Sequence, residues 1–448
     1  MNKLNPNGAV RPEQLAAYGA AYQNNALQKA MSHVLAHCSI ADAAIDDTAM
    51  KQMLHRFSNE LPTMTVTAQK QTGRCWLFAA LNLIRENIAK ENNLEFFECS
   101  QSYAAFWDKF ERVNYFYESI LATADLEVGD RTVQYLLQTG VQDGGQWDMF
   151  VNLVKKYGIV PKDAMPETKQ SSASGDMNRL LNEKIRGDAA HLRRMVAEHA
   201  TDAEIASVKD TLLHQAYGFL CSCYGEPPKT FDFEYVDRDN VYHVERNHTP
   251  QTFAEKYVGD MLSNYVSIIN APTQDKPFHH VYTVELLGNV VEGDPVRHLN
   301  LPMDEFKTLV LQQLGDGEPV WFGSDISYFG SRPHGVWDDS SFDYSSVTGF
   351  TMETTKAERL DHGISAMNHA MVLTGVNLCD GAPNRWKIEN SWGDETGNKG
   401  YYVCSDTWFD QYVFQAVIHK KYLTQYEAVL AEPLVQLKPW DPMGSLAD

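Results

Sequence analysis

The sequence predicts an α+β protein, with helices first along the chain and strands later. Residues 75–92 carry apolar side chains at helical spacing, and about 176–217 alternate apolar and charged residues in a second helical block. The apolar face of the first helix comprises Leu77, Leu81, Ile84 and Ile88. The last third instead holds short apolar runs bounded by Gly, Asn or Asp. This order favours helices packed beside an antiparallel sheet.

Four short segments of the C-terminal third are predicted strands: 320–322, 371–376, 386–389 and 401–404. The last 14 residues contain two prolines and a glycine, so we expect no regular structure there. This segment is expected to be either a disordered tail or an extended arm held in a groove.

Composition indicates an acidic, soluble, cytoplasmic protein. The 448 residues are 44% hydrophobic, which excludes wholesale disorder. Acidic residues outnumber basic ones by 59 to 38, so the net charge of −21 disfavours nucleic acid as a partner. We expect no membrane span, since no apolar run approaches 18–20 residues, and no secretory signal at the start. Seven scattered cysteines suit reduced thiols rather than a disulfide framework.

Cys75 is a candidate nucleophile because it stands at the start of the predicted helix 75–92, after Gly73. The helix dipole and the free N–H groups of the first turn favour the thiolate, which is the nucleophilic form. The alternative is a buried cysteine that acts as a small apolar residue.

A nucleophilic cysteine needs a base, a group that orients the base and donors for an oxyanion. His369 leads into an apolar strand, and Asn390 ends a later strand. Adjacent strands would place them side by side, with Gln69, six residues before Cys75, as an oxyanion donor. Taken singly, His369 could be a core histidine and Asn390 a turn residue.

Together these residues resemble the papain-like cysteine proteases. Gln69 and Cys75-Trp76, a strand-leading His369 and Asn390-Ser391-Trp392-Gly393 follow their pattern. Longer blocks are similar to the bleomycin hydrolase / aminopeptidase C family, among them QKQTGRCWLFAALN, DGGQWDMF, MNHAMVLTGV, IENSWG and PWDPMG. The blocks run from about residue 69 to the C-terminus, with a weakly matching middle.

The resemblance implies a role for each matching position. Cys75 would be the nucleophile, His369 the general base, Asn390 its orienter and Gln69 the oxyanion donor. Trp392 would cover the bond between Asn390 and His369 from water.

Gly144 and Gly145 match the strip on which such enzymes bind substrate backbone as an added strand. Their alternative interpretation is a plain turn.

The family's fold is the papain-like one, with a helical lobe and an antiparallel β lobe, and here a large helical insertion. The spacing of 294 residues from Cys75 to His369 exceeds the 130–150 of papain and cathepsins. The resemblance therefore implies that residues 1–167 form the first part of the catalytic domain, including its helical lobe and a hook insertion. Residues 168–310 would be a mainly helical insertion, and 311–448 the β lobe with the arm. The family also implies a homo-oligomer, a hexamer.

In the family the C-terminal arm lies in the cleft, and its carboxylate receives the ammonium group of the substrate. By this resemblance Asp448 is expected to extend the arm one residue beyond that of many relatives. Its carboxylates could then bind the substrate amine, or the longer arm could change how many residues are removed or block the site. The alternative is a loose tail.

The expected function is therefore an intracellular cysteine aminopeptidase acting on peptides with a free N-terminus. An endopeptidase-type member of the family and a non-catalytic oligomeric binding protein are the alternatives. We expect no metal and no cofactor, because His279-His280 and the pair Cys221/Cys223 lack a zinc framework and there is no phosphate-binding glycine loop. Activity is expected to fall below about pH 5–6, where the thiolate–imidazolium pair is lost.

Overall fold

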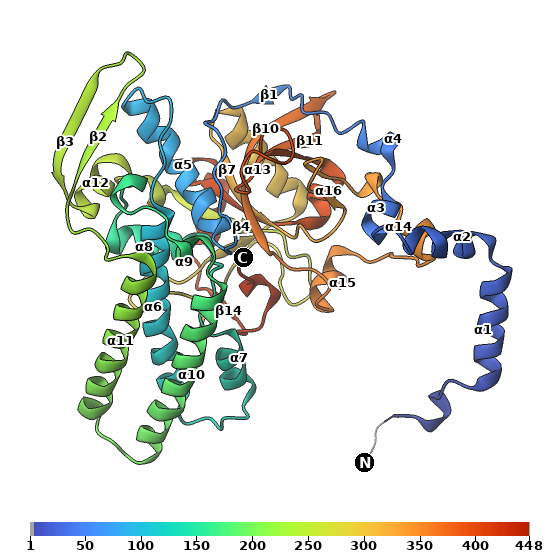
Figure 1. Cartoon of the computed structure of the whole chain (residues 1–448), viewed down its shortest axis with the longest axis horizontal. Helices are drawn as coiled ribbons and strands as arrows, with labels where there is room; N and C mark the ends of the chain where they lie inside the picture. Colours follow the sequence, from blue (N-terminus) through green and yellow to red (C-terminus); the bar gives the residue numbers. More distant parts are fainter. Residues whose placement is uncertain (1–3, 448) are drawn as a thin grey trace. The chain divides into compact units, whose positions relative to one another are not determined.

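The computed structural model describes residues 4–447, which form two compact units (Figure 1). The smaller unit comprises 4–54 and 338–354, and the larger unit comprises 55–337 and 355–447.

The smaller unit is built from short helices. They are η1 (Pro6–Gly8), α1 (Pro12–Asn24), α2 (Ala26–Leu35), α3 (Ile40–Ala44), α4 (Asp47–Met50), η4 (Asp339–Ser341) and α14 (Tyr344–Thr348). Side chains of Asn25, Ser39 and Asp46 cap the helices that follow them. A bridge between Ile45 and Phe342 joins the two parts of this unit. Helices α1 and α2 bury no side chain.

The larger unit is organised around one twelve-stranded sheet. Its strands are β1 (Asn59–Glu60), β4 (Tyr265–Ile269), β5 (His280–Val284), β6 (His298–Asn300), β7 (Val320–Ser324), β8 (Gly330–Ser331), β9 (Val336–Trp337), β10 (His369–Cys379), β11 (Ala382–Glu389), β12 (Tyr401–Ser405), β13 (Val413–His419) and β14 (Val435–Leu437). Their order is β14-β5-β6-β4-β13-β7-β10-β11-β12-β9-β8, with β1 on β10. Most neighbours are antiparallel, but β4–β6, β5–β14 and β9–β12 are parallel.

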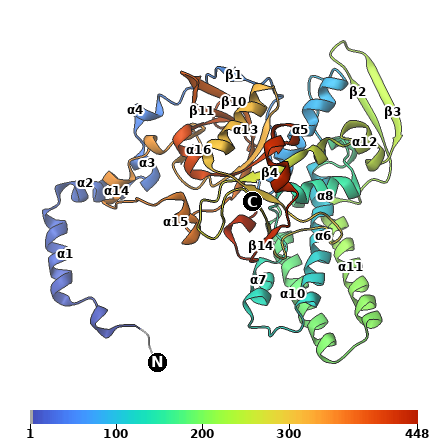
Figure 2. The same cartoon turned by 180° about the vertical axis from the view of Figure 1, so that it is seen from behind.

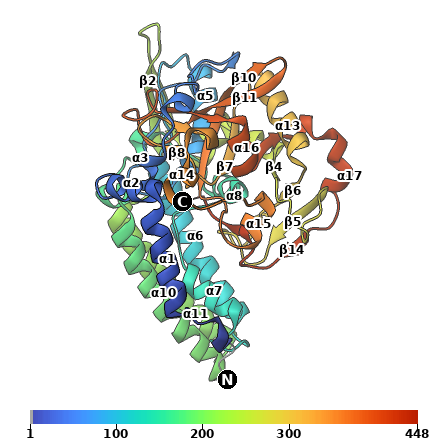
Figure 3. The ribbon, with the colours of Figure 1, turned by 90° about the vertical axis from the view of Figure 1, so that its right-hand side faces the viewer.

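Helices cover this sheet and extend from it. They are α5 (Cys75–Glu91), α6 (Gln101–Ala122), α7 (Arg131–Thr139), α8 (Trp147–Tyr157), η2 (Lys162–Ala164), α9 (Lys169–Ser172), α10 (Gly175–Ala197), α11 (Asp202–Tyr224), α12 (Pro250–Tyr257), η3 (Met261–Asn264), α13 (Met303–Gly315), α15 (Lys356–Asp361), α16 (Asp406–Tyr412), η5 (Lys420–Tyr422), η6 (Thr424–Tyr426), α17 (Glu427–Leu430) and η7 (Pro442–Gly444). Helices α5 and α13 both pack on β10, which explains why its first eight residues are buried. Helices α6, α10 and α11 lie side by side (Figures 1 and 3), and β2 (Phe231–Val236) and β3 (Tyr242–His248) form a separate hairpin.

The predicted fold class is confirmed, as are the helix from residue 75 and the four predicted strands, which correspond to β7, β10, β11 and β12. The expectation of no regular structure in the last 14 residues is wrong for Val435–Leu437 and for the short 3-10 helix η7. Val435–Leu437 form β14 (Figure 2), which adds to β5 before the prolines begin (Figure 3). The expected boundaries at 167 and 310 stay predictions. Residues 168–310 hold α9, α10 and α11, but also β4, β5 and β6 of the large sheet.

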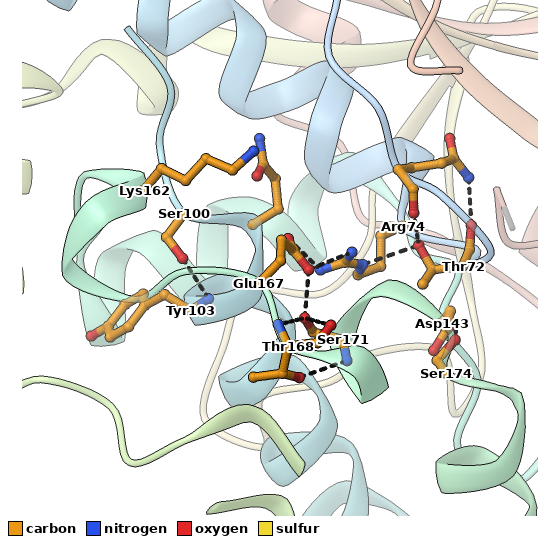
Figure 4. Close-up of polar contacts among 12 residues, drawn as sticks. Thr72, Arg74, Ser100, Tyr103, Asp143, Lys162, Glu167, Thr168, Ser171 and Ser174 are labelled. Carbon is orange, nitrogen blue, oxygen red and sulfur yellow. Dashed lines mark hydrogen bonds and ion pairs between the residues drawn. The ribbon is translucent and has the colours of Figure 1, made fainter. Parts of the chain in front are cut away.

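Two ion pairs, one half-buried and one fully buried, hold the segment that leads into α5. The first joins Arg74, the residue before Cys75, to Glu167 (Figure 4), with N–O distances of 3.1 and 3.0 Å. Arg74 Nε also donates to Thr72 Oγ1 at 3.1 Å, and Ser171 donates to Glu167. The turn before Cys75 is therefore tied to the segment that precedes α9.

The second pair is Lys109–Asp143, with 2.6 Å between Nζ and Oδ1. The Asp143 carboxylate also accepts hydrogen bonds from Gly73 N at 3.2 Å, from Asn178 Nδ2 at 2.9 Å and from Ser174 Oγ. Burial raises the pKa of Asp143, but the Lys109 ammonium and these donors outweigh it and hold the pKa below its usual range. One carboxylate thus connects α6, α10 and the turn before Cys75.

We predict that Lys109→Met lowers the free energy of unfolding at pH 7 by about 3–5 kcal/mol, because Asp143 would keep a buried charge without its cation. Below about pH 4 the difference from wild type should narrow. In the wild type, the stabilisation by Asp143 begins to fall there because the unfolded chain takes up a proton, while folded Asp143 keeps its charge beside Lys109. In the variant, protonation of Asp143 relieves the unpaired buried charge. Urea unfolding at pH 7 and pH 3.5 measures both effects.

The matched control is Lys155→Met, which breaks the pair Lys155–Asp294, whose side chains are 49% and 69% exposed. It should cost less than about 1 kcal/mol. An equally small loss for Lys109→Met would show that the buried pair contributes nothing.

Candidate active site

Cys75 is the first residue of α5 and is fully buried. Its Sγ accepts a hydrogen bond from Ala370 N at 3.3 Å, which fixes the thiol against the start of β10. Helix α5 is 17 residues long, so the positive end of its dipole lies at this sulfur and favours the thiolate.

His369 is the first residue of β10, and Asn390 follows directly after β11. Antiparallel pairing of these strands brings the two side chains together, with His369 Nε2 2.9 Å from Asn390 Oδ1. Asn390 Oδ1 also accepts from Ser391 N at 2.8 Å, which identifies it as the amide oxygen. His369 must therefore carry its proton on Nε2 and keep Nδ1 as the free acceptor of its neutral form.

The surroundings of His369 favour the neutral ring. Burial lowers the pKa of His369 to about 4, and the charge of Arg332 adds to this, while the hydrogen bond to Asn390 opposes it. The Trp392 ring lies 5.0 Å from the His369 ring, at an interplanar angle of 30°. Trp392 therefore packs beside His369, and the prediction that it covers the bond between Asn390 and His369 from water stays a prediction.

Gln69 is held with one face toward Ser391 and the other toward Thr72. Its Oε1 accepts from Ser391 Oγ at 2.6 Å, and its Nε2 donates to the Thr72 carbonyl at 2.5 Å. Its main-chain N–H donates to Ser391 O at 2.7 Å. Since an amide nitrogen carries two hydrogens, one N–H of Gln69 is left for another acceptor.

The last segment of the chain pairs with the predicted glycine strip. Gly145 and Ala447 form an antiparallel bridge, with N–O distances of 3.1 and 3.4 Å. A Cβ on Gly145 would lie 2.5 Å from the Trp76 ring, so only glycine fits here. Gln146 Nε2 donates to Ser445 O at 2.5 Å and extends the contact. The segment is thus an arm held in a groove.

The structure therefore gathers Cys75, His369, Asn390, Gln69 and Trp392, and it places the arm on Gly145. Gly144 contributes its carbonyl, which accepts from the buried Arg112, so that carbonyl faces the protein rather than the arm. Asp448 lies outside the described residues.

Sequence reasoning missed two groups of supporting residues. Ser391 stands next to Asn390, so the motif itself could have suggested its contact with Gln69. Lys109 and Asp143 pair across 34 positions, and no local pattern links them.

Within residues 4–447, no cluster of His, Cys, Asp and Glu side chains could hold a metal ion. In the same range, no helix is both long and apolar enough to cross a membrane.

Comparison of the whole chain with known proteins identifies its family. The model of the Peptidase C1-like family matches residues 9–444. Aminopeptidase C of Listeria monocytogenes serovar 1/2a is 47% identical over 437 residues, covering 97% of this chain and 98% of the relative. Aminopeptidase C of Lactobacillus delbrueckii subsp. lactis is 50% identical over 396 residues, covering 87% and 88%.

A crystal structure of PepW from Lactobacillus rhamnosis HN001 superposes with a TM-score of 0.96 at 49% identity. The match covers 98% of this chain and all of that one. The chain therefore belongs to the Peptidase C1-like family.

Proposed function

We propose that this enzyme is a cysteine aminopeptidase that releases N-terminal residues from peptides by a Cys75–His369–Asn390 mechanism. Relatives named aminopeptidase C, 47–50% identical over most of the chain, support the activity. One observation carries the proposal for this site: the thiol of a cysteine at a helix start bonds to the backbone N–H directly after a histidine whose tautomer is set by an asparagine.

In the first half of the reaction, Cys75 Sγ attacks the carbonyl carbon of the first peptide bond. The negative charge that forms on the carbonyl oxygen is stabilised by the Cys75 N–H and the free N–H of Gln69 Nε2. His369 takes the thiol proton on Nδ1 and gives it to the leaving amine as the C–N bond breaks. The product of this half is an acyl-enzyme on Cys75 and a peptide shortened by its N-terminal part.

In the second half, water attacks the thioester. His369 Nδ1 removes a proton from the water, the C–S bond breaks, and the proton returns to the thiolate or remains on the imidazole. Asn390 holds the ring in place throughout, because its Oδ1 accepts from Nε2 in both protonation states of the ring.

The arm supports cleavage near the substrate N-terminus. Ala447 occupies the main-chain hydrogen-bonding position of Gly145, on which an added substrate strand would otherwise pair. A peptide can then place only a short N-terminal part before Cys75. We propose that the chain terminus, with the carboxylates of Asp448, receives the substrate ammonium group.

We also propose a homo-oligomer, a hexamer as in the resembled family, and a cytoplasmic location. Helices α1 and α2 support the proposed oligomer, since they bury no side chain and leave Leu15 60% and Tyr18 61% exposed. Such exposed apolar side chains are typical of surfaces that contact another subunit. The cytoplasmic location is supported by seven cysteines that are all free thiols.

Cys75→Ala should lower kcat by at least about 1000-fold while leaving the fold unchanged, because the nucleophile is removed. Gln69→Ala should lower kcat by about 100–1000-fold, because one oxyanion donor is lost. Hydrolysis of an aminoacyl fluorogenic substrate measures both, with circular dichroism as the check on folding. Cys221→Ser, which changes a half-buried cysteine on α11, is the matched control and should keep full activity. Substantial turnover by Cys75→Ala would exclude the mechanism.

The pH profile should have its acidic limb lower than the sequence alone suggests. Since burial lowers the pKa of His369 to about 4, the ring stays a neutral base at pH 6 and is protonated only as pH falls through about 4–5. kcat/KM measured from pH 3.5 to 8 should follow this limb.

Asn390→Ala should shift the acidic limb of kcat/KM to lower pH. The hydrogen bond from His369 to Asn390 stabilises the imidazolium, so its removal lowers the pKa of His369. Asn390→Ala should also lower kcat by about 10–100-fold. An acidic limb centred at pH 6 or above would contradict the assignment.

Deletion of residues 445–448 should change substrate choice rather than abolish activity. Wild type should prefer free-amine aminoacyl substrates, and the deletion should raise cleavage of N-blocked peptidyl substrates at least about tenfold in relative kcat/KM. The reason is that the arm no longer occupies Gly145.

A variant lacking only Asp448 is the matched control, since it keeps the Ala447 pairing. If wild type already cleaves blocked peptides well, the enzyme is an endopeptidase-type member of the family.

A further inference from the structure

We propose that Arg332 is a specificity residue of this aminopeptidase that selects peptides with a carboxylate on the first or second residue after the cleaved bond. This inference rests on the proposed function and adds a substrate class to it.

Arg332 lies between β8 and β9 and is stacked on the catalytic site. Its guanidinium carbon is 4.6 Å from the centroid of the Trp392 ring, and that ring is 5.0 Å from the ring of His369. Tyr402 packs edge-on against Trp392 at 5.6 Å, and its hydroxyl donates to the Arg332 carbonyl at 3.3 Å. Both the main chain and the side chain of Arg332 are therefore held in place.

The charge of Arg332 is not neutralised within the chain. Among residues 4–447, no carboxylate lies within 4.0 Å of its guanidinium, and the side chain is exposed. Buried arginines of the same unit behave differently, since Arg74 pairs with Glu167 and Arg85 with Glu389. The chain carries a net charge of −21, so this unpaired cation makes the surface beside the catalytic histidine locally positive within an acidic protein.

The position of Arg332 places it on the leaving side of the cleaved bond. The arm pairs with Gly145, so the substrate residues that precede the cleaved bond lie on the Gly145 side of Cys75. His369 must reach the amine that departs, and Trp392 covers His369. The departing residues therefore cross Trp392, where each extended residue spans about 3.3–3.6 Å. A carboxylate on the first or second of them comes within reach of Arg332.

The chemistry of a guanidinium suits this task. Its planar fork binds a carboxylate through two parallel N–H···O bonds, which an amide or an ammonium group cannot accept in the same way. Stacking on Trp392 sets the plane of the fork before substrate arrives, so less side-chain freedom is lost on binding. The favoured substrates are dipeptides and tripeptides with a free C-terminus, and longer peptides with Asp or Glu just after the cleaved bond.

The test compares Ala-Ala with Ala-Ala-amide, which share a free amine and differ in one carboxylate. Wild type should favour Ala-Ala by about tenfold in kcat/KM, and Arg332→Gln should reduce that preference to within about twofold. Arg332→Lys should retain part of it, because the charge remains and the fork is lost. The preference in wild type should shrink as salt is raised from 0.05 to about 0.5 M.

Arg179→Gln is the matched control. Arg179 is 63% exposed on α10, so this variant changes the net charge by the same amount away from the site. It should keep the wild-type preference. Arg332→Gln should also move the acidic limb of kcat/KM toward higher pH, since the Arg332 charge lowers the pKa of His369.

A wild-type preference below about threefold, or an unchanged preference in Arg332→Gln, would overturn the inference while leaving the aminopeptidase function intact. Failure of wild type to cleave either dipeptide or any free-amine aminoacyl substrate would instead overturn the proposed function, and the inference with it.

Discussion

The site depends on the antiparallel pairing of β10 with β11 beneath the start of α5. That pairing places His369, at the beginning of one strand, against Asn390, just past the end of the other. Cys75 completes the group because α5 packs on β10 and its thiol accepts the Ala370 N–H. A shift of one residue in the strand register would turn His369 to the opposite face of the sheet. The catalytic geometry is therefore a property of the sheet rather than of a loop.

The sequence could predict that Cys75, His369 and Asn390 lie together, because each stands in a short motif whose residues are neighbours along the chain. Cys75 follows a glycine turn, His369 leads a strand, and Asn390 ends one. The residues that hold these three in place could not be predicted from such local motifs. Lys109 and Asp143 come from separate elements, so their pairing depends on how α6 packs, which no local pattern records. The same holds for Arg332, which reaches Trp392 only because β9 pairs in parallel with β12.

Under the proposed function, the C-terminal segment of the chain limits the length of the substrate. Glycine at position 145 is required because Trp76 lies directly beneath it, and the bare backbone it leaves is open to an added strand. Ala447 takes that place, and the side chain of Gln146 secures the arm at Ser445. A groove able to bind an extended peptide is thus shortened by the enzyme's own C-terminal segment. The same backbone groups would serve an endopeptidase if the arm were absent.

Charge acts on this enzyme at two ranges, with opposite effects on an anionic substrate. The net charge of −21 repels a carboxylate at a distance, although salt screens that repulsion beyond about 8–10 Å. Within the site, Arg332 attracts the same group at contact, where salt screens the attraction less than it screens the long-range repulsion. The Arg332 charge also disfavours the imidazolium of His369. The same cation therefore attracts the substrate carboxylate and keeps His369 a neutral base. Because the cation is stacked on Trp392 rather than paired with a carboxylate of the chain, it remains available for both effects.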